Sequence, residues 1–467
     1  MNSKMLKPAI LSVSVLTIMA SAAVAPALGK IRLAFPDANA TLIKLVLTLP
    51  PLIIIPFSLL SGWLVYRVSK KALMITGLLI YLLAGCGGGF ARNITELLVI
   101  RAILGIGVGL IMPLSTTLVG DFFQGPERSK MMGQATSLQN LGGVIFQITA
   151  GYLAVISWRY AFGVYSLALV ILLLIIFWLP EPPRAIVKQA QKPKSRLPMG
   201  VYLCAFLCVL NMIVFFSVPT NLAILLETEK RLFASATPLF KDKEDLQLHL
   251  ESGTISQNTK AAFKDSNIIL SDQARIEVAE PGKAWNIFDG DKKYIVKKED
   301  GQLVISKGKL GKAAVAGYIL SVLSLSAMIS GLILSQILAL LRRYAVPLTI
   351  VLMGAGFWLL GHATNVPMIF MAVTIIGFCF GIIQPFLFVF VQKVAPQDSR
   401  ALAMAIVGSS IFLGQFLSPI VLEGIAALSR QSSIFFKYNF CGGSLAIAGL
   451  VGLALALAIR PAKAVTA

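Results

Sequence analysis

The stretch Gly105–Pro113 reads GIGVGLIMP, and the stretch Gly377–Pro385 reads GFCFGIIQP. Two glycines and the closing proline recur at an offset of 272 residues without a gap. The same register aligns two further pairs: Arg128 with Arg400 and Gly142 with Gly414. Five matches in one register, one of them an arginine, are too many to arise by chance. The chain therefore contains two copies of one structural unit.

A second echo, at an offset of 269 residues, pairs Ser61-Gly62 with Ser330-Gly331. Each member of this pair is followed by a basic turn, Lys70-Lys71 in the first copy and Arg342-Arg343 in the second. The duplication therefore extends over several helices of each half.

Long apolar runs surround these stretches from one end of the chain to the other. Of the 467 residues, 57% are hydrophobic and only 13% are charged, which effectively excludes a soluble enzyme. A membrane span needs about 20 apolar residues. Twelve runs meet that length: Lys7–Leu28, Thr41–Tyr66, Ala72–Phe90, Leu97–Gly120, Met131–Val155, Trp158–Leu179, Met199–Leu226, Ala313–Leu341, Val346–His362, Val366–Val391, Ala401–Ala427 and Ile434–Ile459.

A polar block interrupts the second half between Glu227 and Lys312. It holds 15 Lys or Arg and 14 Asp or Glu and is almost neutral, so nearly all of the net charge of +20 belongs to the hydrophobic part. The expected organisation is six spans in 1–180, a basic linker in 181–198, the seventh span in 199–226, the inserted block in 227–312 and five spans in 313–467.

The first run also resembles a signal peptide, because Lys4 and Lys7 precede it and Ala20-Ser21-Ala22 resembles a cleavage site. The distribution of charge favours a retained span. With a cytoplasmic N-terminus, the inner loops and tails collect eighteen Lys or Arg and the short outer loops only six. This positive-inside bias explains the excess charge without nucleic acid as a partner. It predicts a multi-pass protein of the cell membrane with both termini cytoplasmic and the inserted block outside.

Three motifs resemble the major facilitator superfamily, and the resemblance covers nearly all of the chain outside the polar block. Gly62–Lys71 is similar to the family's signature between spans two and three. Arg101 with the glycines of Gly105–Gly109 is similar to its signature in span four, and Trp158–Phe162 to the start of its sixth span. The resemblance implies an all-α fold of two six-helix halves, with a solute site between them near the midplane.

The gate residues that this resemblance implies lie in the inner loops and at helix ends. The loop signature carries Tyr66 where the family usually has Asp, and Ser69 where it usually has Gly, so a partial gate is implied. In span five, Phe146-Gln147 replaces the Gly-Pro pair associated with antiporters. The expected gating and motif residues are Gly62, Arg67, Lys70, Lys71, Asp121, Arg128, Arg342, Arg343 and Arg400.

Ionisable side chains inside the spans are scarce, and they are functional candidates by default. Arg101 is expected to bond backbone carbonyls or the solute near the outer mouth, with snorkelling to headgroups as the alternative. Lys44 is expected to snorkel. Asp121 and Glu423 are expected to act as interfacial gate residues rather than as proton carriers.

Neutral polar residues offer more candidates for a solute cavity. In lipid each of them needs a partner, so they either hold helices together or line a cavity. Together with Arg101, the candidates are Gln139, Asn140, Gln147, Asn211, Gln336, Gln384 and Gln415. With aromatic residues nearby, such a cavity suits a neutral or cationic amphipathic solute.

The polar block predicts a small α+β insertion. Asp242–Leu250 and Gln257–Phe263 are expected to form short helices, and Trp285–Phe288, Tyr294–Lys297 and Leu303–Ile305 to form a three-stranded meander. No catalytic constellation, metal site or cofactor motif is recognised in it or elsewhere. We therefore expect a transporter rather than an enzyme, monomeric and without a cofactor.

The function expected is proton-linked efflux of small amphipathic compounds by alternating access. One alternative is uptake or facilitated transport of a single metabolite. Another, of a different class, is a membrane receptor that senses a ligand through the insertion.

Overall fold

The chain is described by a computed structural model that covers most of the hydrophobic part and portions of the insertion. The described residues are 5–181, 197–229, 232, 250, 252–253, 255, 260, 263, 270–271, 274–280, 282, 284–289, 292–299, 302–307, 311–397 and 399–458. Most of the predicted linker 181–198 and most of the two short helices predicted in Asp242–Leu250 and Gln257–Phe263 lie outside them.

The chain divides into two compact units. The first, here called the bundle, comprises Met1–Thr228, Lys312–Ala363 and Pro367–Ala467. The second, the inserted unit, comprises Glu229–Gly311 and Thr364–Val366. Each unit is described by itself.

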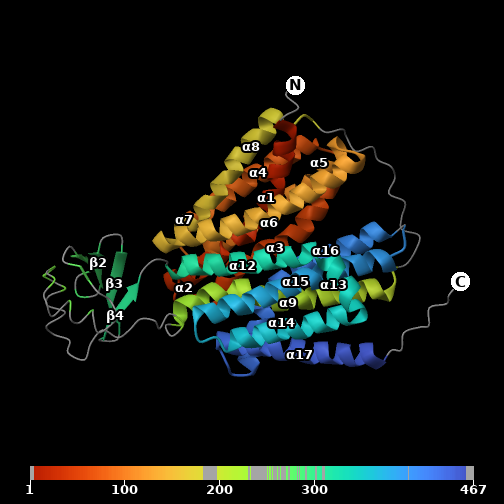
Figure 1. Cartoon of the computed structure of the whole chain (residues 1–467). Helices are drawn as coiled ribbons and strands as arrows, with labels where there is room; N and C mark the ends of the chain where they lie inside the picture. Colours follow the sequence, from red (N-terminus) through yellow and green to blue (C-terminus); the bar gives the residue numbers. More distant parts are fainter. Residues whose placement is uncertain are drawn as a thin grey trace. The chain divides into compact units, whose positions relative to one another are not determined.

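The N-terminal half of the bundle is entirely helical (Figure 1). Its elements are α1 (Leu6–Ala22), η2 (Ala25–Ala27), α2 (Leu28–Ala34), α3 (Ala40–Leu64), α4 (Lys70–Gly87), η3 (Gly88–Phe90), α5 (Ile94–Phe122), α6 (Gly125–Ile156), α7 (Trp158–Ala161), η4 (Phe162–Ser166) and α8 (Leu167–Trp178). The first span is longer than the Lys7–Leu28 run expected, because it continues to Ala34, and it bends by 45° between Leu6–Thr17 and Met19–Ala34. Pro26, at the start of η2, lacks the backbone N–H that would continue the helix ladder.

The C-terminal half repeats this plan. Its elements are α9 (Met199–Thr228), α12 (Lys312–Leu332), α13 (Leu334–Leu341), η6 (Arg342–Tyr344), α14 (Ala345–Gly361), α15 (Val366–Val394), α16 (Arg400–Leu428) and α17 (Ile434–Ala458). The predicted span Ala313–Leu341 is interrupted at Ile333, which separates α12 from α13. Among the described residues, eleven helices are long and apolar enough to cross a membrane, or twelve with the bent first pair. The twelve-span, all-α expectation is therefore confirmed.

Polar caps set where several spans begin. Asn39 accepts a hydrogen bond from the backbone N–H of Thr41 at the start of α3, and Ser69 accepts one from Ala72 at the start of α4. Asn93 does the same for Glu96 at the start of α5. These side chains satisfy amide groups that the first helical turn leaves unpaired. The short polar loops between apolar runs therefore fix the helix ends.

Glycines from the repeated stretches make equivalent contacts in the two halves. A methyl group at Gly105 would overlap Pro50 and Ile53 of α3, and one at Gly377 would overlap Leu323 and Ser326 of α12. These are the contacts of span four on span two and of span ten on span eight. Because only glycine permits such close backbone approach, the 272-residue register reflects one packing used twice.

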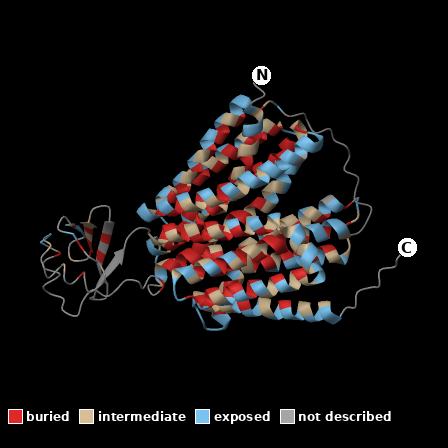
Figure 2. Cartoon of the chain, in the orientation of Figure 1, coloured by how far each residue is buried: buried red, intermediate tan, exposed pale blue. Residues whose placement is uncertain are grey.

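Span five shows the same equivalence. Gly142 of α6 packs on Val15 of α1, and Gly414 of α16 packs on Val209 and Met212 of α9. The outermost helix of the C-terminal half is different, since only 17% of the apolar window of α17 is buried in the protein, and Figure 2 shows it largely exposed or intermediate. An apolar helix with so little protein cover is suited to a lipid environment.

Close contacts between the two halves, among the described residues, gather toward one end of the bundle. We call this the Lys44 end; there α9 ends at Thr228 and α12 begins at Lys312. Gly29 of α2 packs on Ala223 of α9, and Gly151 of α6 packs on Gly317 of α12. In Figure 1 the helices of the N-terminal half (red to yellow) run at an angle to those of the C-terminal half (green to blue) and diverge away from α2. The opposite end is called the Lys70 end.

The inserted unit contains a four-stranded antiparallel sheet in the order β1-β2-β3-β4. The strands are β1 (Arg275–Glu280), β2 (Ala284–Asp289), β3 (Lys292–Glu299) and β4 (Gln302–Lys307). The three predicted strands correspond to β2, β3 and β4, while β1 is an addition to the expected meander. Its sequence, RIEVAE, carries only two β-branched residues and three charges, so local propensity gives a weak signal.

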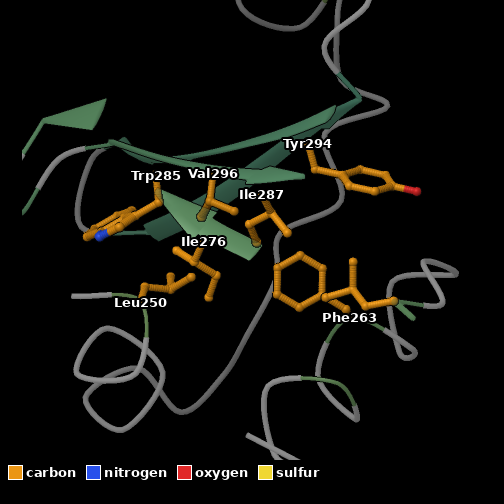
Figure 3. Close-up of a cluster of buried hydrophobic side chains, with 8 residues drawn as sticks. Leu250, Phe263, Ile276, Trp285, Ile287, Tyr294 and Val296 are labelled. Carbon is orange, nitrogen blue, oxygen red and sulfur yellow. The ribbon is translucent and has the colours of Figure 1, made fainter. Parts of the chain in front are cut away.

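One face of this sheet carries a small hydrophobic cluster (Figure 3). Trp285 and Ile287 of β2 alternate along the strand and face the same side, as do Tyr294 and Val296 of β3. Figure 3 shows Leu250 and Phe263 lying across that face. The remaining members are Leu270 and Ile276. The insertion therefore has a core of its own.

Candidate functional site

A cavity of about 360 Å³ lies between the two halves of the bundle. Its walls come from α1, α3, α5 and α6 of the N-terminal half and from α16 of the C-terminal half, each near the Lys70 end except for α1. The lining residues are Ser14, Thr17, Ser58, Leu59, Met112, Pro113, Ser115, Thr116, Val119, Met132, Ala135, Thr136, Gln139, Ala405, Gly408, Ser409 and Phe412. They are hydroxyl-bearing, apolar or amide side chains, and none carries a charge.

Of the eight predicted cavity residues, Gln139 lines this cavity. Its amide Nε2 donates a hydrogen bond to Thr17 Oγ1, which links α6 to α1 across the cavity wall. Asn140, the next residue, is half-buried, and Gln336 is exposed on α13. Gln415 is half-buried on α16. None of these three belongs to the cavity lining.

The other amide candidates connect helices. Gln147 of α6 and Ser324 of α12 hydrogen-bond each other at 3.2 Å and 3.3 Å, and this contact joins the two halves. Asn211 of α9 donates to Gln384 Oε1 of α15 at 3.0 Å, within the C-terminal half. In this conformation these three residues hold helices together rather than face the cavity.

Arg101 is fully buried and does not line the cavity. Its guanidinium donates to the carbonyl of Val46 at 2.9 Å, to the hydroxyl of Tyr165 at 2.8 Å and to the carbonyl of Ala20. It therefore joins α1, α3 and η4 to its own helix, α5. Bonding to backbone carbonyls is one of the two roles expected of it, and its burial excludes snorkelling.

The loop signature between spans two and three is anchored within the N-terminal half. Lys70 Nζ lies 2.6 Å from Asp121 Oδ2 at the end of α5, and Lys71 donates to the carbonyl of Ile176 in α8 at 2.9 Å. The exposed Arg67 guanidinium stacks on the Trp63 ring, with 4.1 Å to the ring centroid. Asp121 is thus the carboxylate partner of Lys70 in this region.

The remaining motif residues lie on the surface at the Lys70 end. Arg128 approaches Gly120, and no atom lies within 4 Å of where a Cβ of Gly62 would be. Arg342 has a positive φ of 46° at the turn after α13, and Arg343 donates to the hydroxyl of Tyr344. Arg400 is exposed at the first turn of α16. None of the ion pairs among the described residues joins the two halves at this end.

At the Lys44 end an ionic cluster joins the halves. Lys44 of α3 is only 3% exposed, and its ammonium donates to Glu423 Oε1 of α16 and to Asn221 Oδ1 of α9. Lys437 of α17 donates to the same Glu423 Oε1 at 2.6 Å. The prediction that Lys44 snorkels is wrong, because its position one turn into α3 places it against α9 and α16 rather than against lipid.

A second, looser ion pair reinforces this end. Lys30 of α2 lies 3.6 Å from Glu227 of α9. In both pairs the lysine belongs to the N-terminal half and the glutamate to the C-terminal half. The sequence could have predicted this cluster. Its charged side chains lie inside predicted spans near the same membrane surface, and such charges pair with one another.

The described residues hold no group of three or more His, Cys, Asp or Glu side chains that could bind a metal ion. The candidate site is therefore an uncharged cavity between two pseudo-equivalent halves, closed by contacts and ion pairs at one end of the bundle.

Comparison with known proteins agrees with this architecture. The family model described as Major Facilitator Superfamily matches residues 10–254, and the model described as Sugar (and other) transporter matches 273–458. The crystal structure of a mutant of the nucleoside transporter NupG is similar in fold, with a TM-score of 0.63 over 96% of this chain and 99% of that chain at 13% identity.

Two curated relatives match over shorter stretches. The multidrug transporter protein MdtP of Bacillus subtilis is 31% identical over 104 residues, which cover 22% of this chain and 19% of that protein. The arabinose-proton symporter of Escherichia coli K12 is 28% identical over 128 residues, or 27% of each chain. The chain thus spans only about a fifth to a quarter of the length of these relatives. Since the first family model covers more than half of the chain, the protein belongs to the Major Facilitator Superfamily and is a multi-pass membrane protein.

Proposed function

We propose that the protein moves a small, uncharged amphipathic organic solute across the cell membrane by alternating access. The cavity between the halves carries this proposal, because it is bounded by both halves and its lining mixes hydroxyl and apolar side chains without a charge. A charged solute would lose its hydration there without an opposite charge to replace it, which is costly.

The hydroxyl groups of the cavity lining indicate which hydrogen-bonding groups the solute carries. Lining hydroxyls donate to carbonyls of their own helices, as Thr116 does to Pro113, Ser115 to Met112 and Thr136 to Met132. Their oxygen lone pairs remain as acceptors. A neutral solute with hydroxyl or N–H donors at one edge and an apolar body matches such walls.

The conformation supports a direction of transport. The charge bias of the loops assigns the Lys70 end to the cytoplasm, and this orientation places the connections to the insertion outside. With the Lys44 end closed, the cavity then receives solute from the cytoplasm. Together with the similarity to a multidrug transporter, this favours export. Protons are the coupling ion we propose, because another relative is a proton symporter.

Uptake is the second candidate, favoured by the similarity to a proton symporter for arabinose and by the Sugar (and other) transporter model. A symporter rests in the same conformation after it has released its solute to the cytoplasm. The geometry of one conformation therefore fits both directions, and a flux measurement separates them.

The test is accumulation of a panel of neutral and cationic amphipathic dyes in cells with and without the protein, before and after a protonophore. Export predicts lower accumulation of neutral dyes that the protonophore reverses. Higher accumulation that the protonophore abolishes would establish uptake instead. Unchanged accumulation across the panel would count against polyspecific transport.

A matched pair of variants assigns the flux to the cavity. Ala405→Trp fills the wall of the cavity and should remove most of the flux. Leu450→Trp places the same side chain at an exposed position of α17 and should leave the flux within about twofold of the wild type. Equal effects of both substitutions would disconnect the cavity from transport.

A further inference from the structure

The ionic cluster at the Lys44 end contains a second lysine, Lys437, beside the Lys44–Glu423 pair that joins the halves. Two ammonium groups, those of Lys44 and Lys437, donate to the same oxygen of one carboxylate, Glu423 Oε1. Both lysines are 3% exposed. Two like charges that share one acceptor repel each other, so each weakens the bond of the other.

The three charges belong to different halves. Glu423 and Lys437 lie on consecutive helices of the C-terminal half, α16 and α17, and 14 residues separate them in sequence. Lys44 is the sole N-terminal-half member of the cluster among the described residues. Asn221, which also accepts from Lys44, belongs to α9 and is held by its own bonds to Ser217 and Thr220.

Separation of the halves at this end therefore divides the cluster unequally. Lys44 leaves with α3, whereas Lys437 remains with Glu423. Without Lys437 the departure of Lys44 would leave a carboxylate in a largely buried position without its counter-charge, which is strongly unfavourable.

We propose that Lys437 is a positioning residue that makes the Lys44–Glu423 contact reversible. It weakens the closed cluster by repelling Lys44, and it keeps Glu423 paired in the open conformation. Both effects favour opening of the Lys44 end. This inference rests on the proposed alternating access and identifies the group that lowers the cost of one of its two transitions.

The experiment measures how readily each end opens, without any solute. Thr48→Cys, one turn inward from Lys44 and fully buried, reports on the Lys44 end. Ser409→Cys, in the cavity lining, reports on the Lys70 end. The labelling rate of each cysteine by a small maleimide is compared with that of the same chain without the reporter, because five native cysteines contribute a background.

Lys44→Met and Lys437→Met should change labelling in opposite directions. Lys44→Met removes the contact between the halves and leaves the Glu423–Lys437 pair, so labelling at Thr48→Cys should rise at least about fivefold. Lys437→Met leaves Lys44 as the only partner of Glu423, so labelling at the same reporter should fall at least about threefold, with no fall at Ser409→Cys. A merely structural lysine predicts that both substitutions loosen the Lys44 end.

A double variant and a charge-matched control complete the test. In Glu423→Gln/Lys437→Met no carboxylate is left unpaired, so labelling at Thr48→Cys should return at least to the wild-type rate. Lys30→Met removes one lysine from the two-membered pair with Glu227 and should not slow labelling. If Lys437→Met does not reach the membrane, Lys437→Gln is measured in its place with the same expectation.

Faster labelling at Thr48→Cys in the Lys437 variants would overturn the proposal for Lys437 and leave alternating access intact. Labelling that none of the substitutions changes at either reporter would also overturn the proposal, whereas alternating access itself is tested separately by the dye accumulation.

Discussion

The two ends of the bundle use the same kinds of contact but direct them differently. At the Lys44 end the ion pairs Lys44–Glu423 and Lys30–Glu227 join the halves. At the Lys70 end the pairs Lys70–Asp121 and Lys7–Glu127 stay within the N-terminal half. The Lys44 end is thus closed because its lysines pair with glutamates of the other half, whereas the lysines of the Lys70 end pair within their own half.

Particular glycines at the two ends are packed differently. Gly151 and Gly317 lie where α6 and α12 cross at the Lys44 end, and neither position has room for a Cβ. Gly62, Gly133 and Gly408 lie toward the Lys70 end, and nothing lies within 4 Å of a Cβ at any of them. Small residues permit close helix approach. We expect the open glycines to admit the other half when the Lys70 end closes.

Alternating access requires each half to move as a rigid body, and Arg101→Met should disturb the N-terminal half with the largest expected effect. The substitution removes three hydrogen bonds of a fully buried cation and leaves only the Tyr165–Ala20 bond among their acceptors, which should cost about 3 kcal/mol or more of stability. Arg159→Met is the control, because Arg159 also donates to two backbone carbonyls but is exposed. Thermal unfolding in detergent should show a large loss for the first variant and a small one for the second.

Gly151→Leu should break the closed end. Its Cβ would lie 2.8 Å from the carbonyl oxygen of Ala313, so the crossing of α6 and α12 cannot form as observed. Overpacking costs about 1–3 kcal/mol, and about 1.4 kcal/mol corresponds to tenfold in an equilibrium constant. Flux should fall at least about tenfold and labelling at Thr48→Cys should rise. Gly443→Leu, where a Cβ meets nothing within 4 Å, should change neither.

Gly133→Leu tests the open end. The observed conformation has room for the larger side chain, so the melting temperature should stay within error of the wild type. We expect the added side chain to obstruct the approach of the other half when the Lys70 end closes, so flux should fall about threefold to tenfold. Unchanged flux would show that α6 does not approach the other half near Gly133.

Asp121→Asn should have the smallest effect. It removes the carboxylate that pairs with Lys70, but the amide oxygen of Asn can still accept a hydrogen bond from the ammonium, so the cost should be about 1 kcal/mol of stability. Because this pair does not join the halves, labelling at Thr48→Cys should change less than about twofold. A large rise, like that expected for Lys44→Met, would mean that the two ends communicate through α5.

The helices and strands of this fold are well predicted from the sequence, because each depends on residues that are close together in the chain. Span length, the repeat register and three of the four strands follow from runs of apolar residues, from glycine spacing and from turn residues. The bend in the first span and the break at Ile333 are not predictable in this way, since both lie inside apolar runs whose hydropathy does not change.

The site is predicted less completely, because side-chain partners depend on packing between distant segments. Sequence identifies Gln139 as a cavity residue but not the hydroxyls of Ser14, Thr17 and Ser409, since serine and threonine are common in membrane helices. The position of Lys44 in α3, taken alone, wrongly predicts that it reaches the membrane surface. Its actual partner, Glu423, is 379 residues away in sequence.

The most direct test of the account is the distance between the halves at each end, measured with spin-label pairs. Exposed positions are available on both halves: Val68 and Leu402 at the Lys70 end, and Leu33 and Leu428 at the Lys44 end. Alternating access predicts that conditions or variants that lengthen the Leu33–Leu428 distance, such as Lys44→Met, shorten the Val68–Leu402 distance. Distances that change in the same direction at both ends, or that do not change at either, would contradict it.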